Sequence, residues 1–260
     1  MANIDGTPQG EEIVGTAGSD RLRGFAGDDV LVGLDGSDAL FGGDGGEGLF
    51  GGPGMDRLFG GNNDDFALEG GAGSDTIDGG AGNDRVRFRE ATEGVVVDLA
   101  AGTARDGQGG VDRLVSIERI EETPFDDVLR GTEGRNVFRM NGGGNDIVDG
   151  RGESDRVEYT EGVAAIHADL RRGVIGMADG SVDRVRDIES VYGTVFADTI
   201  LGADSDVFER FRGGAGNDHL DARRGGAGVD YEDSPNGVVV DLRDGRALDG
   251  FGSRDTIRGF

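Results

Sequence analysis

A nine-residue pattern of apolar and polar positions runs through the first third of the chain. Its units begin at Gly6, Gly15, Gly24, Gly33, Gly42, Gly51, Gly60, Gly70 and Gly79. All steps are nine residues except one step of ten, in which we place the extra residue at Glu69. In each unit the sixth residue is acidic and the eighth is aliphatic or alanine. The three residues that follow the acid have the apolar residue in the middle. This arrangement predicts a short strand with one inward side chain, followed by a glycine-rich turn.

One strand and one turn cannot close a coil, but two units can. Eighteen residues give strand, turn, strand and turn, which brings each unit directly over the unit two before it. The strands then pair in parallel and form a two-sheet solenoid. The pattern therefore predicts an all-β fold. Its core is the column of eighth residues: Ile13, Leu22, Leu31, Leu40, Leu49, Leu58, Ala67, Ile77 and Val86.

The same stacking places the acidic sixth residues in columns along two edges. Carboxylates without partners would repel one another there, and a hard divalent cation removes that problem. Calcium is favoured because it accepts six to eight oxygens, including backbone carbonyls, in a tolerant geometry, whereas magnesium demands a strict octahedron. The expected carboxylate ligands are Asp20, Asp29, Asp38, Asp56, Asp65, Asp75 and Asp84. The expected turn glycines of the sites are Gly15, Gly18, Gly33, Gly36, Gly51, Gly54, Gly70 and Gly73.

Two glutamates interrupt the second of these columns. Glu11 and Glu47 occupy the sixth position where the other units have aspartate. The additional methylene group should move the carboxylate out of a site shaped for aspartate. We therefore expect weaker or altered calcium sites at these two residues.

A longer unit follows Arg87 and repeats about every seventy residues. The stretches that begin at Gly94, Gly162 and Gly237 align, so that Asp98, Asp169 and Asp241 correspond at spacings of 71 and 72 residues. Their alternating apolar residues predict strands longer than those of the nonapeptides. Further, looser nonapeptides follow, with sixth residues at Asp127, Asn136, Asp146, Asp155, Asp198, Asp206, Asp218 and Asp230. Of these we expect Asp127, Asp146, Asp155, Asp198, Asp218 and Asp230 to bind calcium, with fewer ions per repeat than in the first array.

These patterns divide the chain into four parts. Residues 1–87 form the first nonapeptide array, residues 88–158 a second module with the long segment, and residues 159–236 a third module of the same kind. Residues 237–260 are either the start of a further unit, in a chain cut there, or a terminal cap.

The first array resembles the RTX (repeats-in-toxin) calcium-binding repeats, the hemolysin-type family, whose nonapeptide has the same glycine, aspartate and aliphatic positions. The resemblance covers Gly6 to Arg87 closely and the later modules more loosely. It implies a right-handed parallel β-roll with calcium bound between stacked turns. It also implies folding driven by calcium outside the cell, and export from a bacterium by a type I secretion system.

Composition and charge narrow the partners. The chain has 52 acidic and 26 basic residues, for a net charge of −26, which disfavours nucleic acid and calls for a cationic partner. With no cysteine and only two histidines, thiolate and transition-metal sites are disfavoured. No apolar run is long enough to span a membrane, and the first residues lack the layout of a signal peptide. Because the chain has neither a His-Glu-x-x-His nor a Gly-x-Ser-x-Gly motif, we expect it not to be an enzyme.

One sheet of the first array should carry an apolar outer face. The residues that flank its inward column include Val30, Val32, Phe50, Phe66 and Leu68. This face is open to three interpretations: cross-strand contacts that stabilise the sheet, docking of the chain's own later modules, or a contact with another molecule, including self-association.

Two roles remain open above calcium binding itself. One is a secreted structural or adhesive protein that self-associates. The other is a calcium-dependent folding and secretion module of a larger enzyme or toxin. The sequence names no receptor or substrate.

Overall fold

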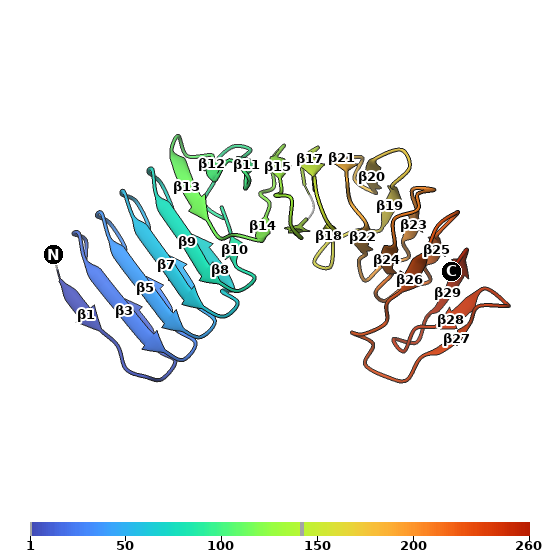
Figure 1. Ribbon diagram of the computed structural model, residues 1–260, viewed down its shortest axis with the longest axis horizontal. Coiled ribbons are helices and arrows are strands. Elements are labelled where there is room, and N and C mark those ends of the chain that lie inside the picture. Colours follow the sequence, from blue (N-terminus) through green and yellow to red (C-terminus); the bar gives the residue numbers. More distant parts are fainter. Residues whose placement is uncertain (1, 141–142) are drawn as a thin grey trace. The chain divides into compact units, whose positions relative to one another are not determined.

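The computed structural model describes residues 2–140 and 143–260, and in these residues every regular element is a β-strand. Its contacts divide the chain into two units (Figure 1). The first comprises Met1–Thr123 and Asp127–Gly131, and the second comprises Pro124–Asp126 and Thr132–Phe260. No helix long and apolar enough to cross a membrane occurs in the described part of the chain.

The first unit contains two sheets, and successive strands of the nonapeptide array alternate between them. In one sheet the nonapeptide strands are β1 (Asn3–Asp5), β3 (Arg21–Ala26), β5 (Ala39–Asp44), β7 (Arg57–Asn62) and β9 (Thr76–Ala81). The opposite sheet contains β2 (Glu12–Val14), β4 (Val30–Val32), β6 (Gly48–Phe50), β8 (Ala67–Glu69), β10 (Arg85–Val86) and β14 (Arg119–Glu121). Figure 1 shows the array strands side by side, from blue to cyan along the sequence.

The pairing confirms the predicted stacking of each unit over the unit two before it. Leu22 pairs with Leu40, Leu40 with Leu58, and Leu58 with Ile77, all between parallel strands. These side chains are fully buried, as are Leu31 and Leu49 of the opposite sheet. The core is therefore one layer of aliphatic side chains between two parallel sheets. The predicted all-β, parallel β-roll class is confirmed.

The ten-residue step contains a bulge at Phe66, so the prediction that Glu69 is the extra residue is wrong. The amides of Phe66 and Ala67 both donate to the carbonyl oxygen of Glu47, the two-against-one pattern of a β-bulge. The bulge shifts the register by one residue, so that Leu68 pairs with Leu49. Leu68 is fully buried in the column, and Glu69 lies beside Phe50.

The long segments fold as antiparallel meanders, and the prediction of longer strands is wrong. In the first unit β11 (Val96–Asp98) pairs with β12 (Thr103–Arg105), and β12 pairs with β13 (Val111–Val115). These strands are three, three and five residues long. The outer strands return to the parallel arrangement, because β13 pairs with β9 and β11 pairs with β15 (Val128–Arg130). The meander therefore extends the same sheet.

The second unit repeats this plan twice. One of its sheets contains β17 (Ile147–Asp149), the meander β19 (Ile166–Asp169), β20 (Val174–Met177) and β21 (Val182–Arg186), then β23 (Thr199–Leu201), β25 (His219–Asp221) and the meander β27 (Val239–Asp241), β28 (Arg246–Leu248) and β29 (Arg254–Arg258). The opposite sheet contains β16 (Val137–Arg139), β18 (Arg156–Glu158), β22 (Ser190–Tyr192), β24 (Glu209–Arg212) and β26 (Ala227–Val229).

Candidate metal centre

The acidic sixth residues of the first array form two hydrogen-bonded columns, which we call the carboxylate ladders. In the first ladder the amide of Asp20 donates to Oδ1 of Asp38 at 2.6 Å, and the amide of Asp38 donates to Oδ1 of Asp56 at 2.7 Å. The order of this ladder is Asp20, Asp38, Asp56, Asp75 and Asp112. The second ladder has the order Glu11, Asp29, Glu47, Asp65, Asp84 and Glu118. Stacking of the predicted acidic residues is therefore what the structure shows.

We call each acidic residue of a ladder a rung. In most rungs, one carboxylate oxygen points into the protein without a partner. These oxygens are buried and accept no hydrogen bond from any described residue: Oδ2 of Asp29, Asp38, Asp56, Asp65, Asp75 and Asp84, and Oε1 of Glu47. Their residues are almost completely buried. A buried carboxylate that lacks a counter-charge is strongly unfavourable, so a repeated row of such oxygens is a row of ligand positions for a cation.

The turn glycines keep the space beside these oxygens open. A Cβ atom built on Gly51 would lie 2.5 Å from Oδ2 of Asp56 and 2.4 Å from the carbonyl oxygen of Gly70. Gly33 is equivalent, with Oδ2 of Asp38 at 2.5 Å and the carbonyl oxygen of Gly51 at 2.6 Å. Each first-position glycine thus lies where a carboxylate oxygen and a backbone carbonyl oxygen meet. A side chain there would fill the space that an oxygen-ligated ion needs.

The predicted turn glycines differ in this respect. Gly15, Gly33, Gly51 and Gly70 are first-position glycines, and a Cβ built on each would lie 2.4–3.1 Å from a carboxylate oxygen of its own unit. Gly36, Gly54 and Gly73 approach the backbone of the preceding coil, whereas Gly18 has open space around it. The first group therefore borders the candidate sites directly, and Gly36, Gly54 and Gly73 allow the coils to approach.

Glu47 fits into its ladder in a modified way. Its Oε2 accepts the Asp29 amide at 3.0 Å, so the hydrogen bond of the ladder is kept. The extra methylene group occupies the space beside Gly42, where a Cβ would lie 2.5 Å from Cγ of Glu47. The second oxygen lies instead near Gly45, at 2.7 Å from an ideal Cβ. The carboxylate therefore stays in the ladder, but one of its oxygens is displaced from the position that aspartate gives it.

Burial without a cation raises the pKa of these carboxyls. Desolvation raises the pKa of Asp56 and of Asp65 to about 7, and that of Asp75 and Asp84 to about 6, with neighbouring carboxylates adding to the effect. Without a bound cation, the carboxyls whose pKa lies at about 7 would be partly protonated at neutral pH. A divalent cation supplies the positive charge that lets them ionise.

Threonine satisfies the carboxylate at several other sixth positions. Thr16 donates its amide at 2.6 Å and its hydroxyl at 2.7 Å to Oδ2 of Asp20, and hydrogen bonds lower the pKa of Asp20. Oδ2 of Asp127 and of Asp198 receives the same pair of hydrogen bonds from Thr123 and Thr194, and the amide oxygen of Asn136 receives it from Thr132. These rungs are stabilised by the protein itself, which gives a physical reason for expecting fewer ions in the later modules.

In the second unit the ladders continue in shorter runs. The amide of Asn136 donates to Asp155, that of Asp146 to Asp183, and that of Asp198 to Asp218. Oδ2 of Asp155 and of Asp218 is buried and has no partner among the described residues. Burial raises the pKa of Asp155 to about 7 and that of Asp218 to about 8.

Sequence reasoning missed the ladder residues that belong to the meanders. Asp112 and Glu118 complete the two ladders of the first unit. In the second unit Asp183, Glu189 and Asp255 hold the equivalent places. A signal was present in the sequence: Val111–Glu118 and Val182–Glu189 share the pattern Val-Asp-Arg followed by Ile-Glu.

Two predicted sixth positions are wrong in the third module. Phe211 pairs with Val191 and is the buried residue of its unit, so Glu209, and not the exposed Asp206, is the acidic residue of that rung. Asp230 follows β26 and lies outside the ladder. Its Oδ2 receives Arg212 at 2.8 Å and the Tyr192 hydroxyl at 3.0 Å, and hydrogen bonds from these groups lower its pKa despite burial. An arginine thus supplies the counter-charge of Asp230.

Comparison with models of protein families supports the calcium interpretation. Four copies of the RTX calcium-binding nonapeptide repeat match the chain, at residues 5–40, 67–88, 142–161 and 205–231. This chain carries RTX calcium-binding repeats. Such repeats bind Ca²⁺, and the row of buried oxygens fits that ion. A search of curated proteins found no match.

In the ladders, the two carboxylate oxygens and the glycine carbonyl oxygens would have different roles around a calcium ion. When bound, Ca²⁺ supplies a divalent positive charge that accepts six to eight oxygen ligands. The aspartate Oδ2 atoms and the glycine carbonyl oxygens beside them are the groups that would hold it. Oδ1 of each aspartate holds the amide of the preceding coil and fixes the carboxylate in place.

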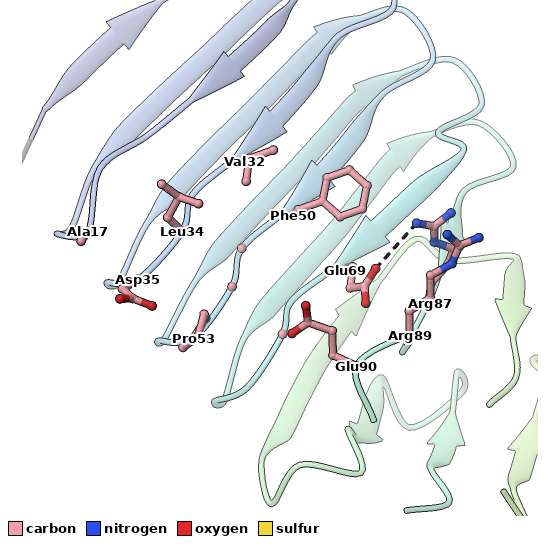
Figure 2. A pocket seen from close by; sticks show the side chains of 13 residues that line it. Ala17, Val32, Leu34, Asp35, Phe50, Pro53, Glu69, Arg87, Arg89 and Glu90 are labelled. Atoms are coloured by element: carbon pink, nitrogen blue, oxygen red, sulfur yellow. Dashed lines mark ion pairs between the residues drawn. The ribbon is translucent and has the colours of Figure 1, made fainter. Parts of the chain in front are cut away.

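The apolar face of the first array is smaller than predicted, because Leu68 is part of the core. Val30, Val32 and Phe50 are half-buried, and Phe66 is 44% exposed. Beside this face lies a hollow of about 610 Å³, lined by Val32, Leu34, Phe50, Glu69 and Arg87 among others (Figure 2). Arg87 lies over the Phe50 ring at 5.7 Å and pairs with Glu69 at 3.7 Å. Arg87, the last residue of the array, therefore covers the part of the face around Phe50.

Proposed function

We propose that this chain is a secreted, extracellular RTX protein that folds when it binds several calcium ions outside a bacterial cell. The observation that carries the proposal is the repeated buried carboxylate oxygen of the ladders, which has no partner among the described residues. Export by a type I system is what the RTX repeats imply, and it is part of the proposal.

The ladders explain why export and folding would be separated. Each short strand contributes one aliphatic side chain to the core, while each coil also buries carboxylates. Without calcium, two effects oppose folding: the net charge of −26 makes the chain repel itself, and the buried acids lose their hydration. A chain of this kind stays extended where calcium is scarce. It folds where calcium is abundant, because binding and folding are coupled.

The proposal is tested by the size of the chain in solution. In chelator at pH 7.5 we expect the radius of gyration of a disordered chain, roughly 56 Å for this length, and a much smaller value after calcium is added. Magnesium at the same concentration is the matched control and should not compact the chain. A compact chain in chelator would contradict the proposal.

The apolar face supports a structural or adhesive role in which copies of the chain associate. Phe66 is exposed and Val30 is half-exposed, and the half-exposed side chains of Val32 and Phe50 line the hollow. Light scattering with and without calcium separates this role from that of a folding and secretion module in a larger enzyme or toxin. Calcium-dependent assembly that Phe50→Ser weakens would support association. The control is Phe59→Ser, because Phe59 stacks on Phe41 in the other sheet at 5.0 Å. A calcium-loaded monomer at all concentrations would favour the module.

We also propose that this segment has no catalytic activity of its own. The support is that the buried acidic residues at the sixth positions of the first array follow the spacing of the ladders and are hydrogen-bonded within them. An activity assay of the calcium-loaded chain on esters, peptides and glycosides tests this; turnover that survives purification to homogeneity would contradict it.

A further inference from the structure

A row of arginines crosses the outer face of one sheet in the first unit. Strands β3, β5, β7, β9 and β13 each contribute one outward residue to this row (Figure 1). In order across the sheet, its members are Arg21, Ala39, Arg57, Thr76 and Arg113. We call it the arginine row. Its three arginines are exposed, and the residues between them are short, so the guanidinium groups are accessible from solvent.

The arginines of this row have no acidic partner. None of Arg21, Arg57 and Arg113 forms an ion pair with a residue that the structure describes. On the opposite sheet, by contrast, Arg85 pairs with the buried Glu121 at 3.4 Å. In a chain with 52 acidic and 26 basic residues, three arginines in one row without a counter-charge are an exception. The row is therefore a cationic strip on an acidic protein.

The neighbouring row adds an apolar surface and little negative charge. Across β1, β3, β5, β7 and β9 it consists of Asp5, Arg23, Phe41, Phe59 and Asp78. Arg23 pairs with Asp5 at 3.5 Å, so Asp78 is the one acid of these two rows that is not neutralised within the described residues. The rings of Phe41 and Phe59 stack with their centroids 5.0 Å apart, and both side chains are half-buried. They form a fixed apolar ledge beside the arginines.

The spacing of the row favours a ligand whose charges repeat along a line. Adjacent strands lie about 4.8 Å apart, so residues on every second strand are separated by about 9.6 Å. Arg21, Arg57 and Arg113 follow this interval across the sheet. The guanidinium of Arg21 lies over the Phe41 ring at 4.6 Å, which holds it in place before any ligand arrives.

Two classes of polyanion fit this surface poorly. Duplex nucleic acid carries one charge per about 1.7 Å of its axis, which is far denser than the row, and the net charge of −26 repels it. An anionic membrane attracts clustered basic residues together with apolar side chains that insert, whereas Phe41 and Phe59 are half-buried against each other. In an acidic polysaccharide whole sugar rings separate the charges, and the ring carbons offer apolar surface.

We propose that the arginine row binds an acidic polysaccharide, whose carboxylate or sulfate groups pair with Arg21, Arg57 and Arg113 while a sugar ring lies against Phe41 and Phe59. Guanidinium groups suit such anions because their planar fork donates two parallel hydrogen bonds. The row exists only where the coils are stacked. The proposal therefore rests on the calcium-dependent fold of the proposed function and adds a ligand to it.

Isothermal titration calorimetry of the calcium-loaded full chain with dextran sulfate tests the proposal. Dextran sulfate should bind, uncharged dextran should not, and binding should weaken as salt is added. Arg57→Glu, at the centre of the row, should weaken binding by about tenfold or more, because it places a like charge against the polymer. Arg224→Glu is the matched control, since Arg224 is exposed in a loop away from the row and the net charge changes equally. It should bind as the unchanged chain does.

A second variant keeps the proposal testable if Arg57→Glu disturbs the sheet. Arg57→Gln removes the charge without reversing it, and it should weaken binding less than Arg57→Glu but more than Arg224→Glu. Circular dichroism in calcium checks the fold of each variant. Calcium that merely bridges the polymer to exposed acids would not be lost with an arginine, so the comparison separates the two kinds of binding.

Equal affinities of the Arg57 variants and the control would overturn the proposal. So would binding to phosphatidylglycerol vesicles in place of dextran sulfate, or assembly of the polymer-free chain that Arg57→Glu abolishes, since these assign the row to a membrane or to a second copy. A chain that folds in calcium but ignores dextran sulfate would overturn the row and leave the proposed function intact. A chain that is folded in chelator and binds dextran sulfate there would contradict the proposed function and support the row.

Discussion

At the scale of single residues, the second oxygen of each ladder carboxylate decides whether a rung needs calcium. Oδ2 of Asp56 is buried without a partner in the described residues, whereas Thr16 donates two hydrogen bonds to Oδ2 of Asp20. Both aspartates occupy the same ladder and the same position of the repeat. The difference therefore comes from a threonine at the second position of the unit, and it separates rungs that require a cation from rungs that do not.

This difference predicts unequal effects of two equivalent substitutions. Asp56→Asn removes a negative charge that only the calcium ion would balance, so calcium should bind more weakly. The calcium concentration at the midpoint of folding should rise by about tenfold, which corresponds to about 1.4 kcal/mol. Asp20→Asn should shift the midpoint much less. Calcium titrations followed by circular dichroism measure both, and equal shifts would contradict the distinction.

The first-position glycines predict a second residue-scale effect. Gly51→Ala places a Cβ 2.5 Å from Oδ2 of Asp56 and 2.4 Å from a carbonyl oxygen, so the coil must open. We expect a loss of stability of about 1–3 kcal/mol, typical of overpacking, together with weaker calcium binding. Gly18→Ala is the control, since the nearest heavy atom to its Cβ is 4.0 Å away. Thermal unfolding in saturating calcium should show little change for the control.

At the scale of elements, the sequence predicted the regular coils and failed where the chain departs from them. The nine-residue spacing was sufficient to pair Leu22 with Leu40 and to place the acids in two ladders. It was not sufficient at Phe66, because an extra residue within a unit can be taken up at any of several positions, and only the backbone hydrogen bonds show which.

The meanders were beyond the pattern for a related reason. Alternating apolar residues indicate a strand but not its partner, and here the partner is antiparallel. Asp112 and Glu118 reach the ladders only because the meander returns the chain to parallel pairing at β13. Their roles follow from the topology and not from their local sequence.

The bulge predicts opposite behaviour for two neighbouring apolar residues. Leu68 is fully buried in the core, so Leu68→Ala should destabilise the calcium-loaded chain by about 2–5 kcal/mol. Phe66 is 44% exposed, so Phe66→Ala should cost much less. Denaturant unfolding in excess calcium compares them. A larger loss for Phe66→Ala would show that the bulge lies elsewhere.

At the scale of the whole molecule, calcium and protons are alternative ways to neutralise the ladders. The pKa of Asp56 rises from an ordinary value of 3.8 to about 7 in the folded, calcium-free chain, and that of Asp218 to about 8. A raised pKa stabilises the fold at pH values below the ordinary one, and this contribution is lost as the pH rises through the raised value. The calcium-free fold should therefore be most favourable in acid and least favourable above pH 7.

A pH titration in chelator checks this linkage. We expect the β signal in circular dichroism to increase as the pH falls from 8 to 5, because the ladder carboxyls take up protons in place of calcium. The same titration at high salt, which screens repulsion between exposed charges, separates ladder protonation from the change in net charge. A β signal that stays constant or decreases over this range would contradict the assignment.

The central claim is that the buried ladder oxygens require calcium for the fold to form. It is tested most directly by circular dichroism of the full chain at pH 7.5, first in excess chelator and then during addition of calcium. The ladders predict a mostly disordered chain in chelator and a cooperative gain of β structure with calcium, but not with magnesium. A β spectrum that melts cooperatively in excess chelator, and that calcium leaves unchanged, would contradict the claim.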